Sequence, residues 1–484
     1  MSGKTVSLQT HDDESLESLR LRAQRALAAG KGRLFSSAGN VLDGETPLKR
    51  ARLQNAEPLT FQVGRVAIQA TWGAFATILG DGSVVTWGRA GSSGVVGQLK
   101  NVQQIQATSA AFAAILVDGS VVTWENANFG GDSSDVNDQL KHVQQIQATN
   151  HAFAAIVGDG SVVTWGDARR GADSSAVHDQ LKNVQQIQAT NYAFAAILGN
   201  GGVVTWGSTA EFGGDRSDVQ FQLKNVCQIQ ANCHAFAAML ADGSVVTWGE
   251  ADAGGDSSAV RDQLKNVQQI QAAKEGAFAA MLGDGSIVTW GDAEYGGDSS
   301  AVQDQLKNVQ QIQATISAFA AILGDGSVVT WGFDRSGGDS SSVRDQLKNV
   351  QQIQSTEEAF AAILRDGSVV TWGQVECGGD SSDVCHQLKN VQQVQATSAA
   401  FAAILVDGSV VTWGNANFGG DSSDVNDQLK NVQQIQATRY AFAAIVGDGS
   451  VVTWGHAISG GDSFAVRDQL SCDQLALGEY YGHR

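Results

Sequence analysis

Residues 309–347 read VQQIQATISAFAAILGDGSVVTWGFDRSGGDSSSVRDQL, and close variants of this stretch fill most of the chain. The tryptophan of this stretch recurs at intervals of 41 or 42 residues after a first interval of 37. A period of this length is typical of a solenoid or propeller, in which each repeat is one supersecondary unit. The ten tryptophans are Trp87, Trp124, Trp165, Trp206, Trp248, Trp290, Trp331, Trp372, Trp413 and Trp454.

Each repeat contains three strand-like runs, which in this stretch are VQQIQA, AFAAIL and SVVTWG. The first run alternates apolar and polar residues, the second is apolar, and the third is rich in β-branched residues. An Asp-Gly pair, or Asn200-Gly201 in one repeat, separates the second run from the third. Asp-Gly between hydrophobic runs predicts a β-hairpin, and we expect a type I′ turn with positive φ at both central residues.

The segment after the third run, GGDSSxVxDQL, has two interpretations. Its Asp or Ser could cap a short helix, because Gln or Asp three residues on completes a pattern like a capping box. Alternatively, its last six residues could form a fourth, outer strand.

Three strands cannot bury both of their faces alone, so neighbouring sheets must stack and bury the repeated Phe, Leu and Trp. At roughly 25 cal/mol/Å² over some 200 Å², each Trp contributes at most about 5 kcal/mol. The stack then closes into a ring or winds into an open coil. Sheets about 10 Å apart would give ten blades an inner radius of about 16 Å. Propellers usually have four to eight blades, so an open superhelix or a seven-plus-three arrangement stands beside the ring that we favour.

The net charge of −19 is unevenly distributed. Residues 1–64 hold nine Lys/Arg and seven Asp/Glu, about +2, so the remaining 420 residues carry about −21. Such a field repels phosphate backbones, and we expect no nucleic-acid binding by the repeats. No run of 18 apolar residues predicts a membrane span, and the polar N-terminus does not resemble a signal peptide. Five cysteines make no disulfide framework, so we expect a cytoplasmic protein, with the nucleus as the alternative.

Residues 1–64 differ from the repeats and predict a small α+β domain. A strand is expected at 4–10, an amphipathic helix at 13–29, and short strands with turns over 32–63. Three stretches, GKTVSLQT at 3–10, ESLESLRLRAQRAL at 14–27 and GRLFSSAGNVLDGETPLKRARLQNAEPLTFQV at 32–63, carry a resemblance to the ubiquitin-like β-grasp family. GKTVSLQT aligns with the second strand of the β-grasp hairpin, so the first strand is missing.

The repeats also resemble a known family. The cadence IQAT-xx-AFAAILGDGSVVTWG, followed by GG and QL, is similar to the regulator-of-chromosome-condensation repeats, and the match covers residues 65–470. The resemblance implies a β-propeller, which 471–484 follow as a tail. Members of that family include a guanine-nucleotide exchange factor, a plant UV-B photoreceptor, and propellers inside HECT-type (HERC-like) ubiquitin ligases. Only Trp72 lies outside the one tryptophan per repeat, so a photoreceptor is not expected.

Strands one and three of a meander end on the same side, and the repeats differ most just after those two ends. Tyr, Trp and Arg often anchor protein interfaces, whereas loop tips also drift without any function, and both interpretations stay open. The Asp-Gly turns are expected on the opposite side. The candidate partner-binding residues are Trp72, His151, Tyr192, His234, Tyr295, Phe333, Arg335, Glu357, Phe418, Arg439 and Tyr440.

Other constellations indicate architecture rather than chemistry. Cys227, Cys233 and His234 lie close in sequence but lack the CxxC spacing of a zinc site, as does the set at 377–386. The nine GGDSS-type aspartates could form a cation-binding acidic ring, but nine equivalent copies favour capping or turns. No catalytic arrangement stands apart from the repeat, so we expect no enzyme activity, no metal and no cofactor.

The sequence therefore predicts a non-catalytic scaffold that binds protein partners through the variable loops. The N-terminal resemblance suggests an adaptor in ubiquitin signalling. The alternative is a regulator of a small GTPase that resembles a guanine-nucleotide exchange factor. A product of repeat expansion without a dedicated partner is a third interpretation.

Overall fold

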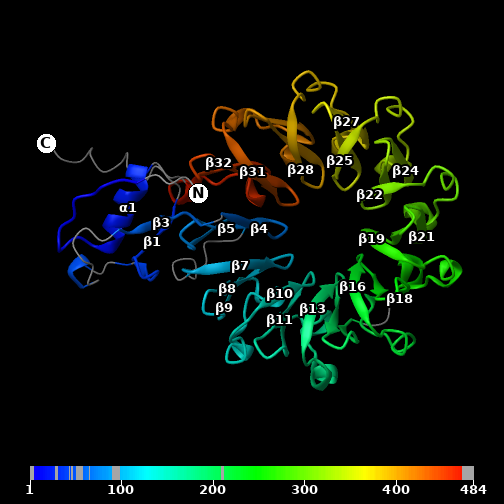
Figure 1. The fold of residues 1–484 in the computed structure, drawn as a ribbon, viewed down its shortest axis with the longest axis horizontal. Helices are drawn as coiled ribbons and strands as arrows, with labels where there is room; N and C mark the ends of the chain where they lie inside the picture. The colour runs from blue at the N-terminus through cyan, green and yellow to red at the C-terminus, as the bar shows by residue number, and fades with distance from the viewer. Residues whose placement is uncertain are drawn as a thin grey trace.

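The structure is a computed structural model that describes residues 5–27, 31–42, 44, 47–50, 58–64, 66–89, 99–208 and 212–470. It is mainly β, with eleven three-stranded antiparallel sheets. Ten of these sheets are the repeats, and they are arranged as blades around a common axis (Figure 1).

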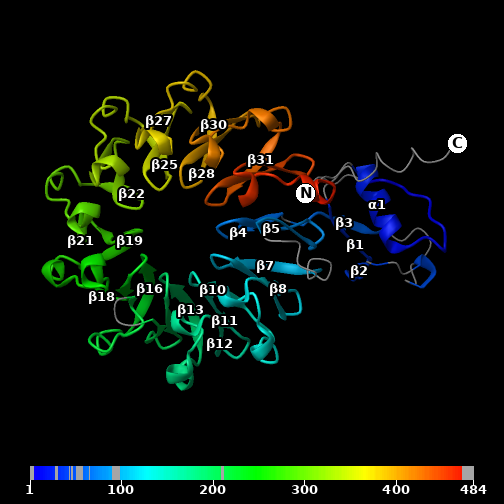
Figure 2. The ribbon, with the colours of Figure 1, turned by 180° about the vertical axis from the view of Figure 1, so that it is seen from behind.

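Each blade is a meander in which the first strand lies nearest the axis and the third lies outermost (Figures 1 and 2). We number the blades 1 to 10 along the chain. Their strands are β4 (Ala67–Ala70), β5 (Ala74–Ile78) and β6 (Val84–Gly88); β7 (Val102–Ala107), β8 (Ala111–Leu116) and β9 (Val121–Glu125); β10 (Gln145–Ala148), β11 (Ala152–Ile156) and β12 (Val162–Gly166); β13 (Val184–Ala189), β14 (Ala193–Leu198) and β15 (Val203–Gly207); β16 (Val226–Ala231), β17 (Ala235–Leu240) and β18 (Val245–Gly249); β19 (Val267–Ala273), β20 (Ala277–Leu282) and β21 (Ile287–Gly291); β22 (Val309–Ala314), β23 (Ala318–Leu323) and β24 (Val328–Gly332); β25 (Val350–Ser355), β26 (Ala359–Leu364) and β27 (Val369–Gly373); β28 (Val391–Ala396), β29 (Ala400–Leu405) and β30 (Val410–Gly414); β31 (Val432–Ala437), β32 (Ala441–Val446) and β33 (Val451–Gly455).

The Asp-Gly turns are hairpin turns, but the predicted type I′ geometry is wrong. In blade 2, Gly119 has a φ of +78°, whereas Asp118 does not have a positive φ. The Gly119 N–H donates to Leu116 O, and the Leu116 N–H donates to Ser120 O, both at 2.9 Å. This is a three-residue loop with a type I turn followed by a left-handed glycine. The Asp118 carboxylate accepts from the Ser120 N–H, which favours this turn over the mirror-image one.

The segment between one blade's third strand and the next blade's first strand, here called the connector, forms short 3-10 turns. In the connector that follows blade 2 these turns are η3 (Ala127–Phe129) and η4 (Ser134–Val136). Asp132 accepts a hydrogen bond from the Ser134 N–H, so the aspartate has the predicted turn role. The alternative of a fourth outer strand is wrong in the described connectors, which pair with no sheet.

The ring is closed. Ten hydrophobic clusters fill ten junctions between blades, one more than an open row of ten blades would have. The cluster at the seam, the junction between blade 10 and blade 1, contains Phe75 and Trp87 with Ala443 and Leu470. Burying the two end sheets against each other stabilises the ring more than loop closure destabilises it.

A stacked Phe–Trp pair lies at the core of every blade, with ring centroids 5.1–5.3 Å apart. In nine blades the indole N–H also donates to a glycine carbonyl of the preceding connector. At the seam this bond joins Trp87 to Gly460 at 2.9 Å, across 373 residues of chain. The tenth donor, Trp124, follows the shortened connector, and residues 90–98 of that connector lie outside the described residues.

The N-terminal module contains α1 (Leu16–Leu27), β1 (Arg33–Phe35), β2 (Val41–Leu42) and β3 (Thr60–Gln62), in the sheet order β2-β1-β3. The predicted helix is confirmed, with its start at Leu16 rather than at residue 13, and residues 28 and 29 of the prediction lie outside the described residues. The strand predicted at 4–10 is wrong over 5–10, which is not a strand, and Lys4 lies outside the described residues. No neighbouring strand pairs with 5–10, and Val6 stays 37% exposed. The β-grasp hairpin is therefore not formed in the described part of the module. A last helix, α2 (Arg467–Leu470), ends the described chain.

Candidate functional site: the loop face

Two loops of each blade lie on one face of the ring, here called the loop face. The first loop follows the innermost strand, and the second follows the outermost strand. A threonine ties them together: Thr149 Oγ1 accepts from the Ala152 N–H at 2.9 Å and lies 3.0 Å from Arg170 O, to which it donates. Asn232 replaces this threonine in blade 5 and donates to Ala253 O. The bond from this position to the second loop forms in blades 2 to 5 and 7 to 9, where it holds the two variable loops in a fixed register, whereas blade 6 has Ala273 there.

The first loops of neighbouring blades are joined by backbone hydrogen bonds. Nine N–H groups donate to the equivalent loop of the next blade at 2.9–3.2 Å, from Trp72 to Ser109 through to Ser398 and Arg439. We call this belt the collar; its residues are Trp72, Ser109, Asn150, Asn191, Cys233, Lys274, Glu275, Ile316, Glu357, Ser398 and Arg439.

The collar makes the ring narrower than the sequence predicted. Ten chains at the roughly 4.8 Å spacing of hydrogen-bonded neighbours give a radius of about 8 Å at this level, not 16 Å. Near the opposite face, the inner strand of blade 2 is joined to the Asp-Gly turn of blade 1, where the Val102 N–H donates to Gly82 O at 2.9 Å. Fully buried alanines on the middle strands, such as Ala320, let the blades approach this closely.

Five half-buried rings form a continuous row on the loop face of blades 2 to 5, here called the aromatic row. The steps along it are Phe129–His151 at 4.4 Å, His151–Tyr192 at 5.9 Å, Tyr192–Phe212 at 4.7 Å and Phe212–His234 at 5.4 Å between ring centroids. The row arises because the second loop of each blade lies beside the first loop of the next. Three predicted site residues, His151, Tyr192 and His234, therefore lie in one row with Phe129 and Phe212, which were not among the candidates.

Arg170 holds the centre of the aromatic row. Its guanidinium lies 4.8 Å above the Tyr192 ring, and its Nη1 is 3.0 Å from His151 Nδ1. Burial and the Arg170 charge together lower the pKa of His151, while Asp167 opposes that shift. His151 therefore accepts from Arg170 in its neutral form, as a hydrogen bond from a cation requires.

A second cluster lies across the seam and contains four of the predicted residues, with His456 as a neighbour. Tyr440 lies 5.0 Å from the Phe418 ring, and the Arg439 guanidinium lies 5.8 Å above Trp72 and 5.7 Å above Tyr440. Trp72 is 50% exposed. Cation–π contacts of this kind fix the guanidinium without neutralising it.

Glu357 joins residues of three blades along the collar. Its carboxylate lies 3.6 Å from Lys274 Nζ of blade 6 and 3.4 Å from Arg439 Nη2 of blade 10. Each partner is two blades away, so long side chains run along the rim of the collar. Lys274 was not among the predicted site residues, and its role depends on the curvature of the ring, which one repeat does not reveal.

Three predicted residues lie on the loop face without joining either cluster. Tyr295 and Phe333 are half-buried and Arg335 is exposed, and within the described residues none of their side chains has a ring contact or an ion pair. His234 ends the aromatic row and lies 3.8 Å from the Glu250 carboxylate.

Charge divides the loop face into two arcs. Blades 10 and 1 to 3 contribute mostly basic side chains, Arg89, Arg169, Arg170 and Arg439, with Glu125 and Asp167 as the acidic ones. Blades 5 to 8 contribute mostly acidic side chains, with Lys274 and Arg335 as the cations. The acidic residues are Glu250, Asp252, Glu275, Asp292, Glu294, Asp334, Glu357, Glu358 and Glu376.

Two partly buried cysteines, Cys233 and Cys377, lie in environments that disfavour the reactive thiolate. Burial raises the pKa of the Cys233 thiol, and burial beside Glu358 raises the pKa of Cys377 to about 11. Among the described residues, no group of three or more His, Cys, Asp and Glu side chains is arranged to hold a metal ion.

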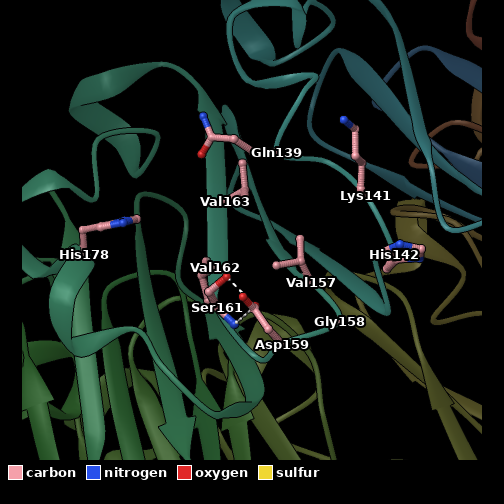
Figure 3. Close-up of a pocket in the computed structure, with 10 residues that line it drawn as sticks. All are labelled: Gln139, Lys141, His142, Val157, Gly158, Asp159, Ser161, Val162, Val163 and His178. Carbon is pink, nitrogen blue, oxygen red and sulfur yellow. Dashed lines mark hydrogen bonds between the residues drawn. The ribbon is translucent and has the colours of Figure 1, made fainter.

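An open groove lies away from the loop face, beside the Asp-Gly turn of blade 3 (Figure 3). His142 and His178 flank this groove from opposite sides, and Asp159 between them bonds to Ser161. The two imidazoles do not converge, so the groove offers no constellation comparable to the aromatic row. In the described part of the chain, no helix is both long enough and apolar enough to cross a bilayer.

Together, the fold and the site define a class of protein: a closed repeat propeller in which one face consists of recurring Asp-Gly turns and the other face consists of loops whose sequence varies between blades. No family model matches the chain, and no curated protein matches it. Among solved structures it is similar to the computationally designed protein Ika8, with 13% identity, a TM-score of 0.33, and coverage of 73% of this chain and 96% of the other.

Two natural proteins are similar to a comparable degree. Prp20p of Saccharomyces cerevisiae, the yeast RCC1 protein, has 17% identity and a TM-score of 0.32 over 49% of this chain and 73% of its own. The ectodomain of the Arabidopsis thaliana receptor kinase ACR4 has 14% identity and a TM-score of 0.31 over 64% and 96%. At these values the likenesses assign neither a family nor an activity to this chain.

Proposed function

We propose that the protein is a non-catalytic scaffold that binds a protein partner across the loop face, with the aromatic row as its main anchor. The supporting observation is that five rings from four blades form one continuous row, although each ring occupies a position that varies between repeats. Aromatic and Arg side chains in such rows dominate binding energy at many protein interfaces. Blades 6 to 8 fold without such a row, so the blades do not need it for stability.

A recent duplication supports the assignment to this face. Residues 107–166 and 396–455 differ at four positions, and two of those are adjacent on the loop face: Asn150-His151 in one copy and Arg439-Tyr440 in the other. The other two differences are Glu125 for Gly414, at the end of a strand, and His142 for Asn431, in a connector, and every other residue of the two copies is identical. The blades therefore accept new loop residues without any change in their cores.

Differential capture tests the proposal. In the double variant His151→Ala, Tyr192→Ala, both sites receive the alanine that blades 2 and 9 already have there, as Ala110 and Ala399. If each ring contributes about 2 kcal/mol, retention of the partner should fall by well over tenfold. The matched control is Glu358→Ala, at the same repeat position in blade 8, and it should retain the partner.

Equal capture by the wild type and both variants would exclude the aromatic row as the anchor. Accelerated guanine-nucleotide release from a small GTPase would instead support the exchange-factor alternative. The role in ubiquitin signalling stays a prediction, and binding of the intact chain to ubiquitin receptors is the measurement that would support it.

A further inference from the structure

The seam is the one junction between blades that no connector crosses. Its cluster and its Trp87–Gly460 bond match those of other junctions, but the collar differs. Nine of the ten collar steps have a backbone hydrogen bond, whereas the step from Arg439 to Trp72, both described residues, has none. Only the Arg439 side chain above the Trp72 ring spans it. Seam opening therefore breaks fewer connections than opening at another junction.

The N-terminal module contacts both blades that flank this seam. On blade 1, Arg33 Nε donates to the Asp81 carbonyl at 2.6 Å, and Arg20 Nη1 lies 3.9 Å from the Asp81 carboxylate. On the blade 10 side, the Lys31 ammonium donates to the Gln469 carbonyl at the end of the last connector. Figure 1 shows the module beside the ring at this place.

The turn of blade 1 has the small residue that this contact needs, a glycine that five other blades also have at this position. A Cβ added to Gly80 would overlap the Lys31 carbonyl oxygen. In other blades the same position holds Val117, Ala241, Arg365 or Val406, so the hairpin itself does not require glycine there. The requirement arises from the module. Arg20, the other basic contact, has only 10% of its side chain exposed, and Glu17 holds it in place by an ion pair.

We infer that the N-terminal module is an intramolecular clasp: it docks on the Asp-Gly turn of blade 1 and on the last connector, and it keeps the seam closed. The segment that covers the Asp-Gly turn of blade 1 thus belongs to the same chain, and it places the basic side chains of Arg20 and Arg33 against Asp81. This inference does not depend on the proposed function. Because Trp72 and Arg439 face each other across the seam, the clasp also preserves the second aromatic cluster.

Hydrogen exchange of the full chain tests the clasp. Gly80→Val should displace the module and make exchange in β4–β6 and β31–β33 about tenfold faster, while blades 5 and 6 keep wild-type rates. Gly324→Val is the matched control, because it places the same side chain at the equivalent position of blade 7, as Val406 does in blade 9. It should leave the seam strands unchanged.

A milder variant separates docking from folding of the module. Arg33→Gln removes the donor to Asp81 without added bulk, and should raise exchange at the seam while α1 stays protected. Wild-type exchange at the seam in both Gly80→Val and Arg33→Gln would overturn the clasp. Equal acceleration in all blades would also overturn it, because the module would then support the whole ring rather than the seam. Unchanged partner capture alongside faster seam exchange would leave the clasp intact and count only against the proposed function.

Discussion

At the scale of single residues, the four differences between the duplicated segments 107–166 and 396–455 show which positions of a blade accept a new side chain freely and which accept it at a cost in stability. Two of their four differences fall on the loop face, and the other two replace Gly414 by Glu125 and Asn431 by His142. Glu125 and His142 both have positive φ, +79° and +56°. Glycine and asparagine adopt that region far more readily than glutamate or histidine.

The first prediction concerns these strained positions. Glu125→Gly should stabilise the protein by about 1 kcal/mol, because it removes a left-handed non-glycine residue. It also removes a buried carboxylate oxygen that has no hydrogen-bond partner among the described residues, and whose burial raises the pKa of Glu125. His142→Asn should stabilise by a smaller amount. A urea midpoint measures both changes.

The reverse substitution in the other copy is the control. Gly414→Glu should destabilise by a similar amount, since a Cβ there would lie 2.7 Å from Ala399 O. A neutral result in both directions would mean that the backbone relaxes without cost at this position.

The second prediction concerns pH. The folded-state pKa of His151 is lowered from 6.5 by burial and by Arg170. The folded state thus binds fewer protons than the unfolded state, so this residue's stabilising contribution is present above pH 6.5 and is lost as the pH falls below that value. Arg170 and Asp167 are the charged groups that contribute to the shift.

His151→Tyr, which installs the residue found at Tyr440, isolates this effect. The thermal midpoint of the wild type, relative to that of the variant, should be constant above pH 6.5 and decrease toward pH 5. A constant difference over the whole range would contradict the pKa assignment.

At the scale of elements, the sequence predicted the strands of the repeats correctly, but it did not predict the turn type or the hydrogen bonds that join one blade to the next. The runs at 309–314, 318–323 and 327–332 match β22, β23 and β24 almost residue for residue. The turn type was wrong, because the side chain of the Asp accepts from the Ser two residues later and selects a type I turn. The collar was not predicted, since its bonds join equivalent residues of different repeats and depend on ring curvature. The strand predicted at 4–10 is not formed over 5–10, because no strand among the described residues pairs with it.

The Asp-Gly turn also forms a backbone hydrogen bond to the next blade, and the third prediction concerns this bond. The carbonyl of Gly326 accepts from the Val350 N–H of the next blade, and a Cβ on Gly326 would lie 2.9 Å from the Asn349 Cα. Gly326→Ala should therefore destabilise by about 2 kcal/mol or more, from left-handed strain and from the displaced hydrogen bond. The urea midpoint should fall accordingly, whereas Gly324→Ala, two residues earlier, should have little effect because Ala241 occupies that position in blade 5.

At the scale of the whole molecule, the ring closes because the seam repeats the hydrophobic cluster and the indole–glycine bond of the other junctions. The sequence predicted the number of repeats and the stacking, but left ring and coil open. The deciding quantity is the distance between blades near the axis, where backbone hydrogen bonds replace the packing of side chains.

The fourth prediction follows from this equivalence. Deletion of residues 309–349, one full period, joins blade 6 to blade 8 through an ordinary junction and should give a closed, monomeric nine-bladed ring. Deletion of residues 456–470 instead removes the last connector, with Leu470 and the Gly460 acceptor of the seam, and uncovers apolar surface of blades 10 and 1, so that protein should associate or aggregate. Negative-stain images and the mass in solution distinguish the two. A nine-bladed deletion that aggregates like the terminal one would show that the ring tolerates only ten blades.

The near identity of blades 2–3 and 9–10 also has a genetic consequence. Tracts of coding sequence this similar are substrates for unequal recombination, which adds or removes whole periods in frame. Since every period carries its own pair of loops and its own half of a junction, such exchanges would reorder the binding surface while leaving each blade intact. A lineage could thus acquire a new recognition surface by rearranging existing blades, without waiting for point mutations in any of them.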